Sequence, residues 1–321
     1  MITENEKATF ALKPQKKVGV FDFPFTLNLF IGCLMQCVYC FVPGPVIKKS
    51  RYDFFSNVEV KTNILKHLKK ELVKYAGLPQ HLKRVQIGVT MELFQPQVIN
   101  YMKTQLGFDL ITEMLKIFED EWKKGNKWML HILTKNHNII GYLPILKQMK
   151  EMVQVEFSII HHDDSISRQY EKYTSSIPKR LGAIDQLSTE GIFVRVMAMP
   201  FYGNQNDLLI LKNLVFNSGA QAFKNKALNY YDWSKLNNIN ALDPLSRSKS
   251  KTNVHIPSLL IKSGEEIKPL KMKNVLLPKL RKRGDKFINW SINPNGLELR
   301  DVPVVDMGYA LINNVDWGYL K

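Results

Sequence analysis

Hydrophobic and polar positions follow two alternating patterns over the first two thirds of the chain. Short, nearly continuous apolar runs rich in Val, Ile and Phe predict strands at 25–31, 85–90, 128–134, 153–160 and 192–199. Such runs are typical of strands that are buried on both faces. Between them, apolar residues recur at helical spacing and predict helices at 57–76, 109–124, 139–150, 178–190 and 206–217.

The boundaries of the first helix can be predicted from residues that favour helix ends. Asn57 is the expected N-cap of the helix at 57–76, and Gly77 followed by Pro79 is expected to end it. Gly191 directly follows the helix at 178–190, where a glycine commonly ends a helix.

Strand–helix alternation of this kind predicts βα units and a parallel sheet. Five or six units in about 200 residues favour a partial barrel, because a full eight-unit barrel typically needs about 250 residues. We therefore expect an α/β protein with a partial (βα)6 TIM-type barrel at 20–225. Residues 226–321 lose the alternation and are expected to form a C-terminal extension that covers the barrel mouth or a small subdomain.

Composition narrows the class of protein. Hydrophobic residues make up 45 % of the 321 residues, which is enough to bury a core. Three cysteines are too few for a disulfide framework and suit a reducing compartment. The N-terminus is polar, and no apolar run approaches the roughly 20 residues that span a bilayer. We expect a cytoplasmic protein with no membrane partner.

The positive charge of the chain is concentrated near its C-terminus. The formal net charge is +16, and the segment 247–286 alone contributes +9. Clustered positive charge is typical of nucleic-acid binding, so DNA or RNA is an expected partner. Nearby Trp233, Phe287 and Trp290 could stack on bases. The alternative is a basic surface that only contacts solvent.

One loop after the first predicted strand contains all three cysteines, Cys33, Cys37 and Cys40. Thiolates bind soft metals, and three of them so close together can hold one metal centre. Two kinds of centre are open. A zinc site would need a further ligand such as His161 or His162, whereas a [4Fe–4S] cluster on three thiolates keeps one iron open. The aromatic Tyr39 and the position after the first strand favour the cluster.

The run Cys33-x3-Cys37-x-Tyr39-Cys40 resembles the C-x3-C-x-aromatic-C signature of the radical S-adenosylmethionine superfamily. That signature lies after the first strand of a partial (βα)6 barrel. Further segments resemble the spore photoproduct lyase-like (DNA repair photolyase-like) branch of this superfamily, namely 26–43, 87–96, 133–136 and 171–207. The resemblance covers residues 20–217 and not the C-terminal hundred residues.

The resemblance implies two cofactors, a [4Fe–4S] cluster and S-adenosyl-L-methionine. Cys33, Cys37 and Cys40 would hold three irons, and the fourth iron would bind the amino and carboxylate groups of S-adenosylmethionine. Reductive cleavage would then give a 5′-deoxyadenosyl radical that removes a hydrogen atom from substrate. The resemblance also implies an electron donor such as flavodoxin or ferredoxin.

Five residues are expected to help bind the cofactor. Lys135 could neutralise the carboxylate of S-adenosylmethionine, and Ser158 could donate to its ribose or carboxylate. Thr90 and Glu92 follow the second strand, where polar groups near the cofactor amine belong. Tyr39 could shield the cluster or contact adenine. Structural interpretations stay open beside these roles: Lys135 as a surface lysine, Ser158 as a core serine that bonds to the backbone, and Tyr39 as a packing residue.

Other polar residues have predominantly structural interpretations. Arg195 lies in an apolar strand, so it needs an anionic partner. The polar group at 161–164 follows the fourth strand, and an Asp helix cap is the favoured interpretation over general acid–base chemistry. Glu171 and Arg180 are expected to pair with each other.

The chain departs from spore photoproduct lyases in one respect. That family uses a further cysteine outside the cluster as hydrogen-atom donor, and this chain has none. Either the substrate differs or the hydrogen returns by another route, for example through a tyrosine among Tyr202, Tyr230 and Tyr231. Three hypotheses remain: a radical enzyme acting on nucleic acid, one acting on a peptide or small molecule, and a zinc-stabilised nucleic-acid-binding module without catalysis.

Overall fold

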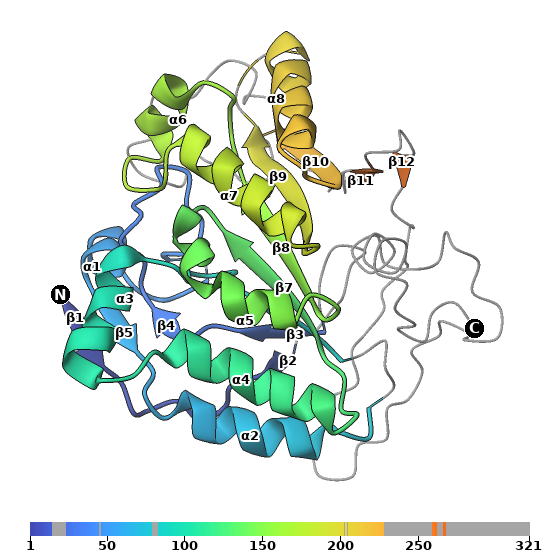
Figure 1. Cartoon of the computed structure of the whole chain (residues 1–321). Helices are drawn as coiled ribbons and strands as arrows, with labels where there is room; N and C mark the ends of the chain where they lie inside the picture. The colour runs from blue at the N-terminus through green and yellow to red at the C-terminus, as the bar shows by residue number, and fades with distance from the viewer. Residues whose placement is uncertain are drawn as a thin grey trace, which may run out of the picture.

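A nine-stranded sheet organises the computed structural model of the chain (Figure 1). The structure describes residues 1–14, 24–44, 46–78, 83–201, 203, 205–227, 259–261 and 266–267. Six strands are parallel and adjacent in chain order: β3 (Phe25–Leu27), β6 (Arg84–Ile87), β7 (Met129–Thr134), β8 (Val153–Ser158), β9 (Phe193–Phe201) and β10 (Ala222–Ala227). This order confirms the predicted partial (βα)6 architecture.

Antiparallel strands flank the six parallel ones. One end of the sheet carries β2 (Lys13–Pro14), and the other carries β11 (Leu259–Ile261) and β12 (Glu266–Ile267). Beyond these two short strands, the predicted C-terminal extension at 226–321 lies almost wholly outside the described residues, as do most of the basic segment 247–286 and the nearby Trp233, Phe287 and Trp290. The domain division at residue 225 and the role of this extension stay predictions.

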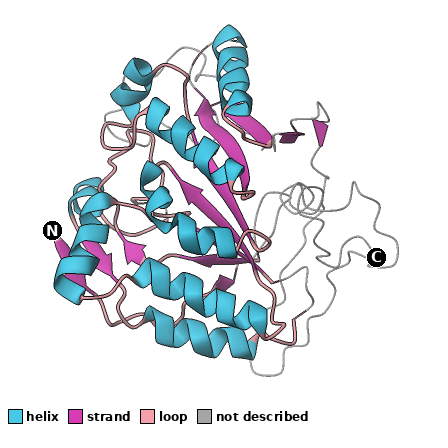
Figure 2. Ribbon diagram, in the orientation of Figure 1, coloured by secondary structure: helices cyan, strands magenta, loops and turns pink. Residues whose placement is uncertain are grey.

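Helices between the parallel strands cover one side of the sheet (Figures 1 and 2). The main ones are α2 (Ile64–Lys74), α4 (Leu110–Lys123), α5 (Leu143–Gln148), α7 (Ile177–Thr189) and α8 (Gln205–Asn217). Asp109 caps α4 by accepting hydrogen bonds from the N–H groups of Ile111 and Thr112. Gly191 follows α7 with a positive φ of 80°, which confirms its predicted place after the helix.

Shorter elements complete the described part of the chain. They are α1 (Arg51–Ser56), α3 (Pro96–Tyr101), a π-helical turn (Met102–Leu106), a 3-10 turn (His137–Tyr142) and α6 (Asp164–Tyr170). The 3-10 turn replaces the beginning of the helix predicted at 139–150. No helix among the described residues combines the length and apolar character that crossing a membrane requires.

The predicted helix at 57–76 is wrong over its first turns. Residues Val58–Val60 form strand β5, which pairs with β1 (Ile2–Glu4) and β4 (Phe30–Ile31) in a separate three-stranded sheet. Val58 and Val60 are fully buried, so this segment buries alternate residues at strand spacing. Asn57 is consequently the C-cap of α1 and not the N-cap of α2.

The predicted strand at 25–31 is also divided. Its first half is β3 in the large sheet, and its last two residues form β4 in the small sheet. The chain therefore leaves the barrel sheet before it reaches the cysteines, and the small sheet supports the loop that carries them.

Candidate functional site

One pocket of about 150 Å³ lies at the carboxyl ends of the parallel strands. Its walls include all eight residues that the sequence predicted for a site: Cys33, Cys37, Tyr39, Cys40, Thr90, Glu92, Lys135 and Ser158. Met197 and Met199 of β9 add an apolar wall.

Backbone geometry explains how the first cysteine is placed. Gly32 has a φ of +107°, and a Cβ atom there would lie 2.0 Å from the carbonyl oxygen of Asn57. Only glycine therefore fits directly before Cys33. The N–H of Cys33 donates to the carbonyl oxygen of Phe54 at 2.9 Å, which ties the loop to helix α1.

Arg51 at the start of α1 holds the other two cysteines in place. Its guanidinium donates to the carbonyl oxygens of Cys40 at 2.8 Å, Val38 at 3.0 Å and Cys37 at 3.3 Å. Partial burial lowers the pKa of Arg51 from its ordinary value, although the neighbouring cysteines act in the opposite direction. Sequence reasoning missed this residue, because nothing in the motif indicates that a later arginine binds the loop.

The three thiols are free of disulfides and lie in an apolar environment. Burial raises the pKa of Cys33 to about 12, and it also raises the pKa of Cys37 and Cys40. Without a cation the thiols therefore keep their protons. A bound metal reverses this, since ligating thiols lose their protons to the metal's charge. Three thiols that line one pocket are a donor set that suits an iron–sulfur cluster.

Lys135 joins the cysteine loop to strand β8 and to the end of α6. Its Nζ donates to the hydroxyl of Tyr39 at 2.6 Å, to Oγ of Ser158 at 2.7 Å and to Oε1 of Glu171 at 2.7 Å. The Tyr39 hydroxyl donates to the same Glu171 oxygen. Oε2 of Glu171 lies 2.6 Å from Nη2 of Arg180, so the predicted Glu171–Arg180 pair is confirmed.

The charges of this network favour an anion at the pocket wall. Burial alone would raise the pKa of Glu171, but Arg180 and Lys135 outweigh it and lower that pKa to about 2. Burial and the Glu171 charge raise the pKa of Tyr39 well above its ordinary value, so the phenol keeps its proton. One carboxylate thus faces two basic groups, and Lys135 is the one that reaches the pocket.

Glu92 and Thr90 fix the loop after β6. The buried Glu92 carboxylate accepts hydrogen bonds from the Thr134 hydroxyl and from the N–H of Lys135, both at 2.7 Å. Burial raises the pKa of Glu92 despite these bonds. The N–H of Thr90 donates to Oδ1 of Asn28 at 3.3 Å. Glu92 therefore has a clear structural role in joining β6 to β7, and its contact with a cofactor amine stays a prediction.

The remaining polar predictions lie outside the pocket walls. Arg195 is buried and pairs with Glu156, with Nε 2.8 Å from Oε1, so it has the anionic partner that its strand requires. Asp163 caps α6 by accepting from the N–H of Ser165, which confirms the predicted helix cap. His161 and His162 do not line the cysteine pocket, so the zinc alternative that used them gains no support.

Comparison with solved structures bears on the fold. Spore photoproduct lyase in complex with dinucleoside spore photoproduct superimposes with a TM-score of 0.52 at 15 % identity. A mutant of the same enzyme with bound AdoMet and the dinucleoside superimposes with a TM-score of 0.51 at 15 % identity. The fold of this chain is similar to that of spore photoproduct lyase. In each case the match covers 68 % of this chain and 57 % of the other chain, so the similarity concerns part of both proteins.

The similarity to spore photoproduct lyase confirms the fold that the cysteine motif implied. No protein-family model and no curated protein match the sequence of this chain. Function must therefore be argued from the residues of the pocket.

Proposed function

We propose that this chain is a radical S-adenosylmethionine enzyme. The observation that supports this most directly is the shared pocket, which is lined by three cysteines at C-x3-C-x2-C spacing together with Tyr39, Lys135 and Ser158. Cys33, Cys37 and Cys40 would hold a [4Fe–4S] cluster, and the donor set leaves one iron for S-adenosylmethionine. When bound, the two cofactors supply a reductively formed 5′-deoxyadenosyl radical that removes a hydrogen atom from substrate.

The pocket residues would bind and orient S-adenosylmethionine and keep water away. Lys135 would pair with its carboxylate by exchanging its hydrogen bond to Tyr39 or Ser158 for one to that group, while the ion pair with Glu171 holds the ammonium group in place. Ser158 would donate to the ribose or the carboxylate. Met197 and Met199 would contact the adenine ring and exclude water from it. Tyr39 would cover the cluster from the side of Glu171.

Iron loading tests this proposal independently of any substrate. The full chain, reconstituted anaerobically with iron and sulfide, is expected to bind about four irons and to show the brown absorbance of an iron–sulfur cluster. Cys37→Ala should lose that absorbance, whereas Val153→Ala, a buried truncation at the amino end of β8 and away from the pocket, should keep it. Zinc binding with no iron–sulfur absorbance would contradict the proposal and favour a zinc-stabilised module.

We infer that the substrate is a nucleic acid. The solved spore photoproduct lyase carries a dinucleoside lesion, and this chain combines a similar fold with a net charge of +16. If the basic segment contacts phosphates, the logarithm of the affinity for DNA or RNA falls linearly with the logarithm of salt concentration. An affinity that does not change with salt would favour a peptide or a small molecule instead.

A further inference from the structure

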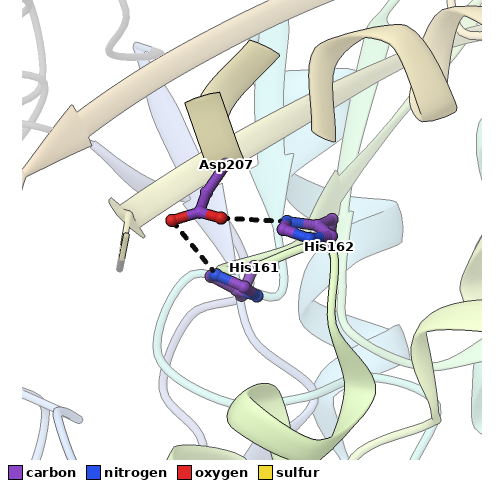
Figure 3. A group of neighbouring side chains, drawn as sticks. All are labelled: His161, His162 and Asp207. Atoms are coloured by element: carbon purple, nitrogen blue, oxygen red, sulfur yellow. Dashed lines mark ion pairs between the residues drawn. The ribbon is translucent and has the colours of Figure 1, made fainter. Parts of the chain in front are cut away.

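A second group of polar side chains lies beside the pocket, where strands β8 and β9 end. His161 and His162 follow β8, and Asp207 lies in the first turn of α8 (Figure 3). Nε2 of His161 is 3.9 Å from Oδ2 of Asp207, and Nδ1 of His162 is 4.0 Å from Oδ1. One carboxylate therefore faces both imidazoles, each through a different oxygen.

The group is close to the side of the pocket that β8 and β9 form. Ser158 lines the pocket and precedes His161 by three residues, and Met199 lines it two residues before Phe201. The ring of Phe201 stacks on that of His161 at 6.5 Å with an interplanar angle of 13°. The two imidazoles also stack on each other, with centroids 4.4 Å apart. These contacts hold both rings at the carboxyl edge of the sheet.

The hydrogen bonding of His161 distinguishes it from a metal ligand. The N–H of Asp163 donates to Nδ1 of His161 at 2.9 Å, so this nitrogen carries a lone pair. The proton of the neutral ring is then on Nε2, the atom that faces Asp207. A metal-binding histidine normally donates from its second nitrogen, which is the reverse of this arrangement. Burial, with His162 adding to it, lowers the pKa of His161 and favours the neutral ring.

His162 is placed differently. Its Nδ1 is buried and makes no hydrogen bond within the described residues, and Asp207 is the carboxylate next to it. About a fifth of the side chain, 22 %, remains exposed, so the ring is not sealed in the core. This is the arrangement of a histidine whose inner nitrogen faces an orienting carboxylate while its outer edge is accessible. The 4.0 Å contact is longer than a hydrogen bond, and pairs of this kind often close to hydrogen-bond distance only when substrate binds.

We propose that His162 is a general acid–base residue, that Asp207 orients it, and that His161, with its protonated Nε2 facing the other carboxylate oxygen, holds the charge of Asp207 in place. The proposal rests on the proposed function and extends it to the substrate. Nε2 of His162 takes the proton of a substrate O–H or N–H group, the electron pair of that bond stays on the substrate, and the imidazolium is stabilised by the Asp207 carboxylate. Asp207 is thus a positioning residue.

Ring tautomers, read from ¹⁵N–¹H correlation spectra of the full reconstituted chain, test this directly. The chain has seven histidines, so each signal is assigned by its loss in His161→Gln or His162→Gln. We expect His161 to be protonated at Nε2 and neutral His162 at Nδ1. Asp207→Asn should move the His162 proton toward Nε2 and leave His161 unchanged, because the N–H of Asp163 fixes that ring. Asp185→Asn, an exposed change in α7, should alter neither ring.

Two results would overturn the acid–base pair. In the first, the His162 tautomer is the same in wild type and Asp207→Asn. In the second, equimolar Zn²⁺ shifts the ring signals of His161 and His162 together, which indicates a metal site. Cleavage of S-adenosylmethionine is measured on the same samples. Its absence would overturn the proposed function, whereas the tautomers report on the pair alone, so the two failures can be told apart.

Discussion

Replacing Glu171 by Gln removes the carboxylate that Lys135 and Arg180 share. The change keeps the shape of the side chain and leaves two basic groups without their counter-charge, one of them buried. The pKa of Glu171 is lowered from 4.5 to about 2. At about 1.4 kcal/mol per pKa unit, this corresponds to ~3 kcal/mol of folding free energy at neutral pH. The value agrees with the roughly 3–5 kcal/mol that breaking a buried ion pair costs.

Urea unfolding of the full chain measures this loss. At pH 7 we expect Glu171→Gln to lower the free energy of unfolding by ~3 kcal/mol. Glu113→Gln breaks an exposed pair with Lys116 and should cost less than about 1 kcal/mol. Because the folded-state pKa of Glu171 is depressed, its contribution is present above about pH 4.5 and is lost as the pH falls toward 2. Equal losses in both variants, or a difference that does not shrink with falling pH, would refute the reasoning.

Three further predictions concern the cysteine loop. Arg51→Met should lower the iron content after reconstitution several-fold, because three carbonyl groups of the cysteine loop lose their hydrogen-bond donor. Lys116→Met, a change at an exposed lysine, should leave the iron content unchanged. Gly32→Ala should lower the free energy of unfolding by more than about 2 kcal/mol, because its backbone is left-handed and a Cβ atom would clash with Asn57. Gly77→Ala is the control and should change the free energy little, because a Cβ atom there meets no other atom. Loading the cluster at pH 7 should release about three protons per chain beyond those that the four sulfides lose, one from each buried thiol. A release that matches the sulfides' share alone would contradict neutral thiols.

The sequence predicted the barrel well because its strands are buried on both faces and so read as continuous apolar runs. It failed at 57–60, where Val60 lies four residues before Ile64 and so continues the helical stripe, although Val58 and Val60 alternate at strand spacing. The pairing of this segment with residues 2–4 decides the outcome, and a partner more than fifty residues away leaves no local signal. The same reason explains why the strand at 25–31 divides between two sheets.

The sequence predicted the site residues at the strand ends well, and it did not predict the residues that bind and position them. The cysteines, Lys135 and Ser158 are found together because parallel strands bring their carboxyl ends to one edge. Arg51 acts on backbone carbonyl groups, which any loop offers, so its role has no sequence pattern. The Asp207 contact with His161 and His162 spans more than forty residues and likewise required the structure.

Cleavage of S-adenosylmethionine by the reconstituted full chain tests the central claim most directly. With a reductant such as dithionite, under anaerobic conditions, we expect 5′-deoxyadenosine to form in wild type and in Val153→Ala. We expect none in Cys37→Ala, because the third thiolate of the cluster is missing. 5′-Deoxyadenosine formation that persists in Cys37→Ala, or a wild-type chain that binds iron and sulfide yet never cleaves S-adenosylmethionine, would contradict the account.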